Sequence, residues 1–212
     1  MRKEPKMGGK CVVITGGDFS PVPRPAPGDF VIACDLGYEY ALRCGVRPDL
    51  LIGDFDSYTG ALPADIPIER FRAEKDDTDT MIAVRYAIEH GFDEIELRCA
   101  LGGRLDHTLA NLQSMVFAAE HGLTATAGDQ TTCIRTMTPG ELVLSKREGW
   151  SLSVFAAKDL CTGVCIRGAK YPLDNADVTS SFPIGVSNAW KDGEAHISLG
   201  SGVLLIVMSR YS

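Results

Sequence analysis

The 212-residue sequence has no long run of basic residues, and its formal net charge is −7. Proteins that bind DNA or RNA cluster lysine and arginine side chains against the phosphate backbone. We therefore do not expect nucleic acid as the main partner. A small nucleotide is compatible with this charge, because a divalent cation can neutralise its phosphates.

Long apolar runs are also absent. The longest, residues 203–208, is far shorter than the roughly 20 residues that span a membrane. The N-terminal residues carry charges but no apolar segment followed by small residues, so no secretory signal is expected. The cysteines are scattered, odd in number, and include no pair separated by two residues. This pattern is typical of a reduced chain, and we expect a cytoplasmic protein without membrane contact.

What the sequence does contain is an alternation of short apolar runs and helical patterns in its first part. Residues 11–15, 30–34 and 50–52 are apolar runs, each followed by glycine or aspartate, and residues 38–44 suit a helix. Continuous apolar runs are typical of strands that are covered on both faces, as in a parallel sheet.

Two longer helices are predicted from apolar stripes. The first begins near Asp77 or Thr78 and ends at Gly91. Its stripe is Met81, Val84, Ala87 and Ile88. The second ends at Gly122, and its predicted core stripe is Leu105, Leu109, Leu112, Val116 and Ala119. Strands that alternate with helices predict an α/β domain with a mostly parallel sheet.

The pattern changes near Pro139 and Gly140. Beyond them, short runs of alternating polarity are separated by Gly, Pro, Asp and Asn, which predicts antiparallel strands. We therefore expect an α/β domain over residues 1–138 and a small all-β domain over residues 139–212.

The first of three acidic clusters has the sequence GDFDS and follows a predicted strand. In extended backbone Asp54 and Asp56 point to the same side, where they can share one magnesium ion with substrate phosphates. The same residues are also common in simple turns. A D-x-D pair occurs in phosphatases and sugar-nucleotide transferases as well.

The second cluster, KDDTD, opens the first long helix. Acidic residues at a helix start can simply satisfy free amides and match the helix dipole. Three of them, Asp76, Asp77 and Asp79, exceed what capping requires and favour a metal site. Lys75 beside them can hold a phosphate as a point charge.

The third cluster is GGRLDH, between a strand and the second long helix. Glycines allow a ligand to approach the backbone closely, and Arg104 can bind phosphate oxygens with two donors. Asp106 is equally compatible with a helix cap, and His107 with polar surface. Because all three clusters follow strand ends or open helices of one sheet domain, we expect one pocket at one sheet edge.

The order of GDFDS, KDDTD, LGGRLDHTLANL and finally GVSNAW resembles the thiamine pyrophosphokinase family. The resemblance implies transfer of the diphosphoryl group of ATP to the hydroxyl of thiamine, with Mg²⁺ as the metal. It also implies a Rossmann-like domain, a β-sandwich domain, and a homodimer with active sites at the subunit interface.

The same resemblance implies roles for individual residues. The catalytic and metal-binding residues it implies are Asp54, Asp56, Asp76 and Asp79. The ATP-binding residues it implies are Asp35, Ser57, Lys75, Thr78, Arg104, Asp106 and His107. The thiamine-binding residues it implies are Tyr171, Ser187 and Asn188. One position departs from the family pattern: Leu36 stands where a glycine is usual, which affects the expected fit near Asp35.

Other functions fit parts of this pattern. The chain could act on another heterocyclic alcohol such as a pterin, because the phosphate half of the site would look the same. A magnesium-dependent phosphatase would use Asp54 as its nucleophile and release free phosphate. A nucleotide or thiamine sensor on the same fold would bind ligands without forming AMP.

Overall fold

The computed structural model describes residues 8–55, 58, 60–70 and 77–211. The chain divides into two compact units, Met1–Gln130 and Thr131–Ser212. The division lies before Pro139 because strand β7, Thr132–Met137, pairs with strand β13, Leu204–Arg210, of the second unit. The functional division after residue 138 stays a prediction.

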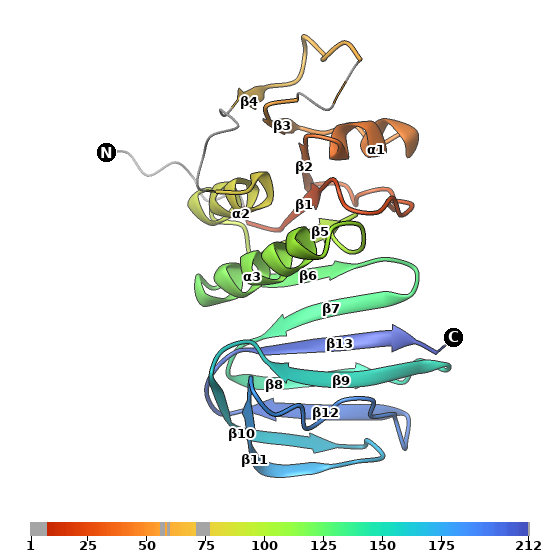
Figure 1. Ribbon diagram of the computed structural model, residues 1–212, viewed down its shortest axis with the longest axis vertical. Helices are drawn as coiled ribbons and strands as arrows, with labels where there is room; N and C mark the ends of the chain where they lie inside the picture. The colour runs from red at the N-terminus through yellow and green to blue at the C-terminus, as the bar shows by residue number, and fades with distance from the viewer. Residues whose placement is uncertain (1–7, 56–57, 59, 71–76, 212) are drawn as a thin grey trace. The chain divides into compact units, whose positions relative to one another are not determined.

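The first unit holds the predicted parallel sheet (Figure 1). Its strand order is β4-β3-β2-β1-β5-β6, and the neighbouring strands pair in parallel. The order reverses beside β1, and such a switch point opens a crevice at the carboxyl ends of the strands. The bounds are β1 Lys10–Ile14, β2 Phe30–Cys34, β3 Leu50–Gly53, β4 Ile68–Arg70, β5 Glu94–Arg98 and β6 Thr124–Gly128.

Helices cover both faces of this sheet, as expected of a Rossmann-like domain. Helix α1, Gly37–Arg43, buries Tyr40 and Ala41 against Val12 and Val31. Helix α2, Asp79–Glu89, packs on the opposite face, where Tyr86 stacks on Phe30 with ring centroids 5.7 Å apart. Helix α3, Leu105–Glu120, contacts α2 and β6. The α/β prediction for the first part of the chain is therefore confirmed.

The predicted core stripe of α3 was partly wrong. Leu105 and Leu109 are 72% and 53% exposed, whereas Asn111, Met115 and Ala118 are buried. Among these buried residues, Asn111 is polar, and its side-chain amide donates to the carbonyl of Ala100 at 2.8 Å. A buried polar residue with a hydrogen-bond partner thus lies on the core face, while the two leucines lie outside it.

The second unit is the predicted antiparallel sandwich. One sheet has the order β7-β13-β9 and the other β11-β10-β12-β8. Leu152, Ile166, Ile197 and Ile206 fill the core between them, and the indole of Trp190 donates to the carbonyl of Leu144 at 3.0 Å. The remaining bounds are β8 Gly140–Ser145, β9 Trp150–Ala156, β10 Leu160–Arg167, β11 Leu173–Thr179 and β12 Glu194–Leu199.

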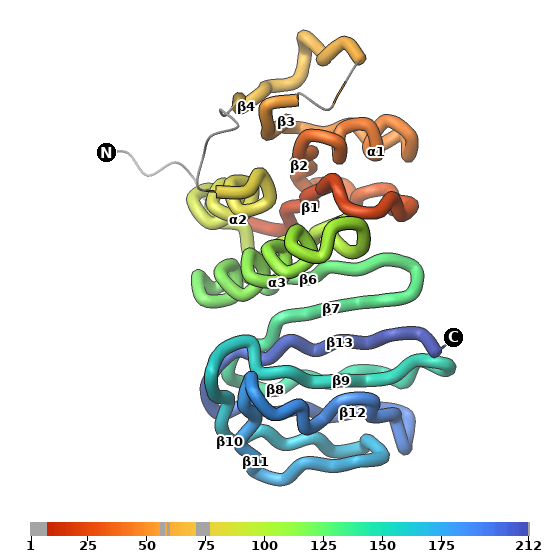
Figure 2. Tube along the Cα trace, in the orientation of Figure 1, coloured from red at the N-terminus to blue at the C-terminus, as the bar shows by residue number. Residues whose placement is uncertain are grey.

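Between β11 and β12 the chain has no regular secondary structure apart from isolated β-bridges. Figure 2 draws this segment in blue. This segment carries Ser187 and Asn188, so its backbone hydrogen bonds determine how those residues are presented. Elsewhere, no helix in the described part of the chain is long and apolar enough to cross a membrane.

Candidate active site

A cavity of about 410 Å³ lies at the carboxyl ends of β1, β2 and β3 and at the starts of α2 and α3. It is the crevice that the strand order predicts, and it collects residues from all three acidic regions. The residues that line it are Thr15, Gly16, Gly17, Cys34, Asp35, Leu36, Asp54, Asp77, Thr78, Asp79, Thr80, His107, Ala110 and Asn111.

Asp35 directly follows β2 and is fixed by the loop after β3. Its Oδ1 atom accepts a hydrogen bond from the backbone N–H of Phe55 at 3.1 Å. Asp35 and Phe55 both have positive φ, 43° and 59°, which is unusual for residues with a side chain. Gly53 has φ 145°, a conformation that residues with a side chain rarely adopt, and a Cβ there would also meet the Asp35 carboxylate. The structure therefore brings Asp35 and the backbone around Asp54 together.

The described carboxylates of this cluster repel one another. The pKa of Asp35 is raised to about 7, first by burial and then by its hydrogen bond to Asp79 and the negative charges of Asp79 and Asp54. A carboxyl group in this position keeps its proton near neutrality unless a cation is present.

Oxygen donors of this kind suit Mg²⁺, which needs only a few carboxylates beside water and substrate phosphates. Among the described residues, no three His, Cys, Asp or Glu side chains are grouped closely enough to hold a metal by themselves. Asp56 and Asp76 lie outside the described residues, as do Ser57 and Lys75. Of the predicted metal ligands, Asp54 and Asp79 are described, and the charges of both act on Asp35.

The start of α2 has both structural and site residues. The Oγ1 atom of Thr78 accepts the N–H of Met81 at 3.1 Å, so Thr78 is the helix cap. Asp79 is the first helical residue, and the side chain of Asp77 pairs with Arg85 at 3.0 Å. Thr78 thereby fixes where the helix begins and places Asp79 in the pocket.

The third cluster lies in the loop before α3. Gly102 and Gly103 have positive φ, 77° and 62°, and a Cβ on Gly102 would overlap the carboxylate of Asp18. Arg104 pairs with Asp106 at 2.6 Å, and this exposed ion pair lowers the pKa of Asp106. Neither of these two side chains lines the cavity, whereas His107 does.

The departure at Leu36 does not strain the backbone. Leu36 has φ −57° and ψ −24°, ordinary right-handed values that any residue adopts. The glycine that this turn requires is Gly37, because a Cβ there would overlap the carbonyl oxygen of Ile14. Leu36 is half-buried beside the core under α1 and lines the pocket, where it adds an apolar wall.

Sequence reasoning missed two buried polar residues of the pocket. The hydroxyl of Thr15 donates to the carbonyl of Cys99 at 2.7 Å, and Asn111 donates to that of Ala100. Both bonds tie the β5–α3 loop to neighbouring elements. Asn111 stands within the stretch LGGRLDHTLANL, but the sequence does not reveal its hydrogen-bond partner.

In the second unit, Tyr171, Ser187 and Asn188 lie in neighbouring segments. Tyr171 and Ser187 are exposed, whereas Asn188 is buried. The carboxamide of Asn188 bonds to the backbone N–H and carbonyl of Tyr171 at 2.9 and 2.6 Å. The structure therefore connects these predicted residues, although only two of them present side chains to solvent.

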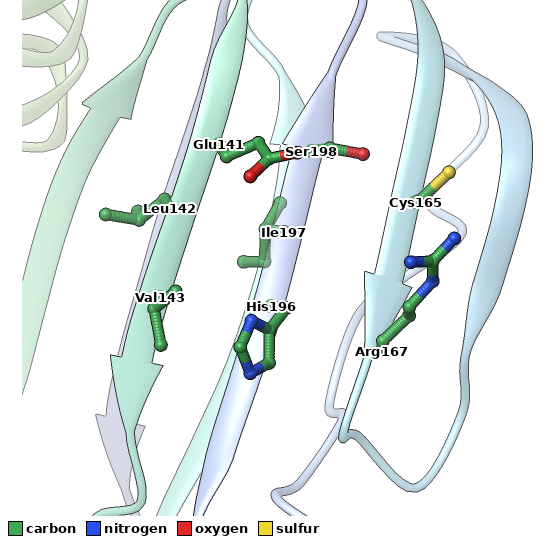
Figure 3. Close-up of a pocket in the computed structure, with 8 residues that line it drawn as sticks. All are labelled: Glu141, Leu142, Val143, Cys165, Arg167, His196, Ile197 and Ser198. Carbon is green, nitrogen blue, oxygen red and sulfur yellow. The ribbon is translucent and has the colours of Figure 1, made fainter.

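A further depression of about 340 Å³ lies over the face of β8, β12 and β10 that carries Val143, Arg167 and His196 (Figure 3). None of the predicted site residues lines it. An antiparallel sheet commonly leaves one polar face in water, and this face needs no other explanation.

Comparison with known proteins gives matches along most of the chain. A family model described as "Thiamin pyrophosphokinase, catalytic domain" matches residues 27–126. A second, "Thiamin pyrophosphokinase, vitamin B1 binding domain", matches residues 141–204. The curated thiamine pyrophosphokinase of Bacillus subtilis (strain 168) is 29% identical over 187 residues, which cover 84% of this chain and 86% of that protein.

Solved structures agree with these matches. A crystal structure of thiamine pyrophosphokinase from Bacillus subtilis has a TM-score of 0.85 at 27% identity, covering 95% of this chain and 99% of that one. The enzyme structure from Geobacillus thermodenitrificans has a TM-score of 0.80 at 27% identity, with 96% and 98% covered. Since the family models match residues in both units and the folds agree, the chain belongs to the thiamine pyrophosphokinase family.

Proposed function

We propose that the carboxylate pocket of the first unit binds the ATP and metal of the family's reaction, and that the second unit binds the acceptor. The function is that of the family: the diphosphoryl group of ATP passes to the hydroxyl of thiamine and gives thiamine diphosphate and AMP. One observation supports this division of labour most directly. The carboxylate cavity at the sheet's switch point lies in the unit that matches the family's catalytic domain.

Mg²⁺ would be held by Asp54 and Asp79 together with Asp56 and Asp76, and it would neutralise charge on the phosphates. The raised pKa of Asp35 supports this assignment, because a bound cation would relieve the repulsion between these carboxylates.

The protein's own residues would then bind and align the triphosphate. The N-termini of α2 and α3 both reach the pocket, where their free amides and dipoles favour negative charge. His107 and Thr78 line this region, and Lys75 would add a point charge. The side chain of Arg104 pairs with Asp106, and because both side chains are exposed this interaction is weak. Arg104 can therefore exchange that partner for a phosphate.

On the acceptor side, Tyr171 is 57% exposed and is available to stack on a cationic ring of thiamine. Ser187 is exposed, and it directly precedes Asn188, whose carboxamide oxygen accepts the backbone N–H of Tyr171. The match of residues 141–204 to the vitamin B1 binding domain supports placing the acceptor here.

We also propose a homodimer with active sites at the subunit interface, located in the cytoplasm. The exposed Leu105 and Leu109 on α3 support a contact with a second copy, because α3 also carries the pocket residues His107 and Ala110. None of the seven cysteines, all of which lie in the described ranges, forms a disulfide, which supports a reducing compartment. Light scattering on the wild type and on Leu109→Glu tests the dimer: a monomeric wild type would contradict it.

The reaction is tested with purified full-length protein, ATP, Mg²⁺ and thiamine. We expect AMP and thiamine diphosphate in equal amounts, and neither without thiamine. AMP that appears only with a hydroxymethyl pterin would redirect the acceptor assignment. Free phosphate in place of AMP would indicate a phosphatase, and thiamine binding without AMP would indicate a sensor.

A further inference from the structure

The segment that carries Ser187 runs beside strand β9. Between its hydrogen bonds to β9 this segment has one residue more than a regular antiparallel pair of strands. Leu152 and Asn188 exchange both backbone hydrogen bonds at 2.9 Å, and the N–H of Val154 donates to the carbonyl of Gly185 at 3.0 Å. Two steps along β9 therefore correspond to three steps along the segment. This is a β-bulge, a feature that is common next to active sites because it redirects a side chain.

The bulge leaves the N–H of Ser187 without a partner on the β9 backbone, and a side chain takes that role. The hydroxyl oxygen of Ser153, a buried residue of β9, accepts this N–H at 3.0 Å. Ser187 itself has φ 56°, a left-handed conformation that a residue with a side chain rarely adopts. The Ser153 hydroxyl thus holds Ser187 in an otherwise unfavourable conformation, with its side chain exposed.

A second buried polar group fixes Tyr171. The Oδ1 atom of Asn188 accepts the N–H groups of Tyr171 and Ala189, each at 2.9 Å, and its Nδ2 donates to the carbonyl of Tyr171 at 2.6 Å. Asn188 is only 1% exposed. The Asn188 carboxamide makes the two hydrogen bonds to the Tyr171 backbone that a neighbouring strand would otherwise make. Its oxygen and nitrogen are therefore already hydrogen-bonded within the protein.

The surrounding backbone makes this arrangement rigid. The N–H of Lys170 donates to the carbonyl of Ala189 at 2.8 Å, and that of Lys191 donates to the carbonyl of Gly168 at 2.9 Å. The neighbouring Trp190 is buried and anchored through its indole. Two exposed side chains, Tyr171 and Ser187, therefore project from a frame that two buried side chains determine.

We propose that Ser153 and Asn188 are positioning residues for acceptor binding, which hold Ser187 and Tyr171 in place without touching the acceptor themselves. This inference rests on the proposed function, in which the second unit binds thiamine. It assigns a role to Ser153, and it changes the role of Asn188 from a direct contact to a support.

Steady-state kinetics of the full-length protein test the role of Ser153. Loss of one neutral hydrogen bond predicts that Ser153→Ala raises the KM for thiamine roughly three- to tenfold, with the KM for ATP and kcat unchanged. Ser153→Thr keeps the hydroxyl and is expected to restore the KM. Ser151→Ala is the matched control, because Ser151 lies on the same strand and its hydroxyl bonds to the carbonyl of Ser209 at 3.2 Å. This control should leave both KM values unchanged.

A double-mutant cycle shows whether Ser153 acts through Ser187. Ser187→Gly removes the hydroxyl and tolerates the positive φ. In that background Ser153→Ala should add little to the KM for thiamine. For the second pair, Asn188→Asp places an acceptor against the Tyr171 carbonyl, and its effect on the KM for thiamine should shrink in a Tyr171→Ala background. Melting temperatures of all variants identify any loss of fold, and Ser187→Gly changes no buried group.

Fully additive effects in both cycles, or equal changes in the KM for ATP and thiamine, would overturn the positioning role. An unchanged KM for thiamine in Ser153→Ala would do the same. These outcomes differ from a failure of the proposed function, in which the wild type itself would form no thiamine diphosphate, and the inference would fall with it.

Discussion

The carboxylate of Asp35 accepts the backbone N–H of Phe55 at 3.1 Å, which ties the loop after β2 to the loop after β3. Both residues have positive φ, so two adjacent strand ends leave the sheet in sharp turns. Asp54 lies directly before Phe55, and its backbone is therefore placed by a neighbouring carboxylate. Asp35 therefore stabilises the loop after β3 in addition to any contact with substrate.

The charge on Asp35 predicts a pH-dependent stability. Its pKa is about 7 in the folded chain against about 4 when unfolded. The folded state then holds more protons in this range, so the Asp35 contribution to the free energy of unfolding falls as pH rises through it. With EDTA present, Asp35→Asn should therefore gain stability relative to the wild type as the pH rises, measured by urea unfolding.

The matched control is Asp65→Asn, because Asp65 is exposed and pairs with Arg47 at 3.0 Å. This variant separates the loss of an exposed carboxylate from the loss of the partly buried one at Asp35. Added Mg²⁺ should reduce the advantage of Asp35→Asn at high pH. A stability difference for Asp35→Asn that stays constant with pH would contradict the assigned pKa.

The metal assignment predicts a large loss of turnover without a loss of fold. Asp54→Asn and Asp79→Asn should each lower kcat about a hundredfold or more, because metal-assisted charge stabilisation is worth several kcal/mol. Each variant should also need more Mg²⁺ for half-maximal rate. Melting temperatures check the fold, and Asp65→Asn serves again as a control. A near-normal kcat in either variant would remove that residue from the metal site.

Gly37 predicts a specific packing defect. A Cβ there would overlap the carbonyl oxygen of Ile14, so Gly37→Ala should lower the free energy of unfolding by about 1–3 kcal/mol, as overpacking does. Gly193 has open space and no positive φ, and Gly193→Ala should change stability little. Equal stability of the two variants in urea would show that the turn after β2 can move away from β1.

The cap of α2 predicts a coupled effect on stability and activity. Thr78→Ala removes the acceptor for the Met81 N–H and should cost about 1 kcal/mol. Because Asp79 is the next residue, the same variant should raise the Mg²⁺ concentration needed for activity. Thr78→Ser keeps the oxygen and should recover both properties. If Thr78→Ala lowered stability alone, Asp79 would not depend on the cap.

The parallel sheet and the position of the pocket could be predicted from local signals. Apolar runs such as that of β2 ended in Asp35, and Thr78 marked the start of α2. The core face of α3 could not be predicted in this way, because Leu105 and Leu109 are the larger apolar residues yet remain exposed. The burial of Asn111 depends on a carbonyl in the preceding loop, and periodicity carries no such information.

The contacts on the acceptor side could be predicted even less from the sequence. The pairing of Ser153 with Ser187 joins residues 34 positions apart. It arises from a bulge that no local pattern specifies. Asn188 could be noticed in the sequence, but only the fold shows that its carboxamide is enclosed by the backbone of Tyr171 and Ala189.

The two tryptophans of the chain are Trp150 and Trp190, and both lie in the second unit. Trp190 is buried, and Trp150 packs against the same core. Fluorescence excited selectively at tryptophan will therefore report on the antiparallel unit alone, because the first unit contains no tryptophan. One optical signal can thus follow melting of the sandwich, and far-ultraviolet circular dichroism of the helices can follow the other half of the same molecule.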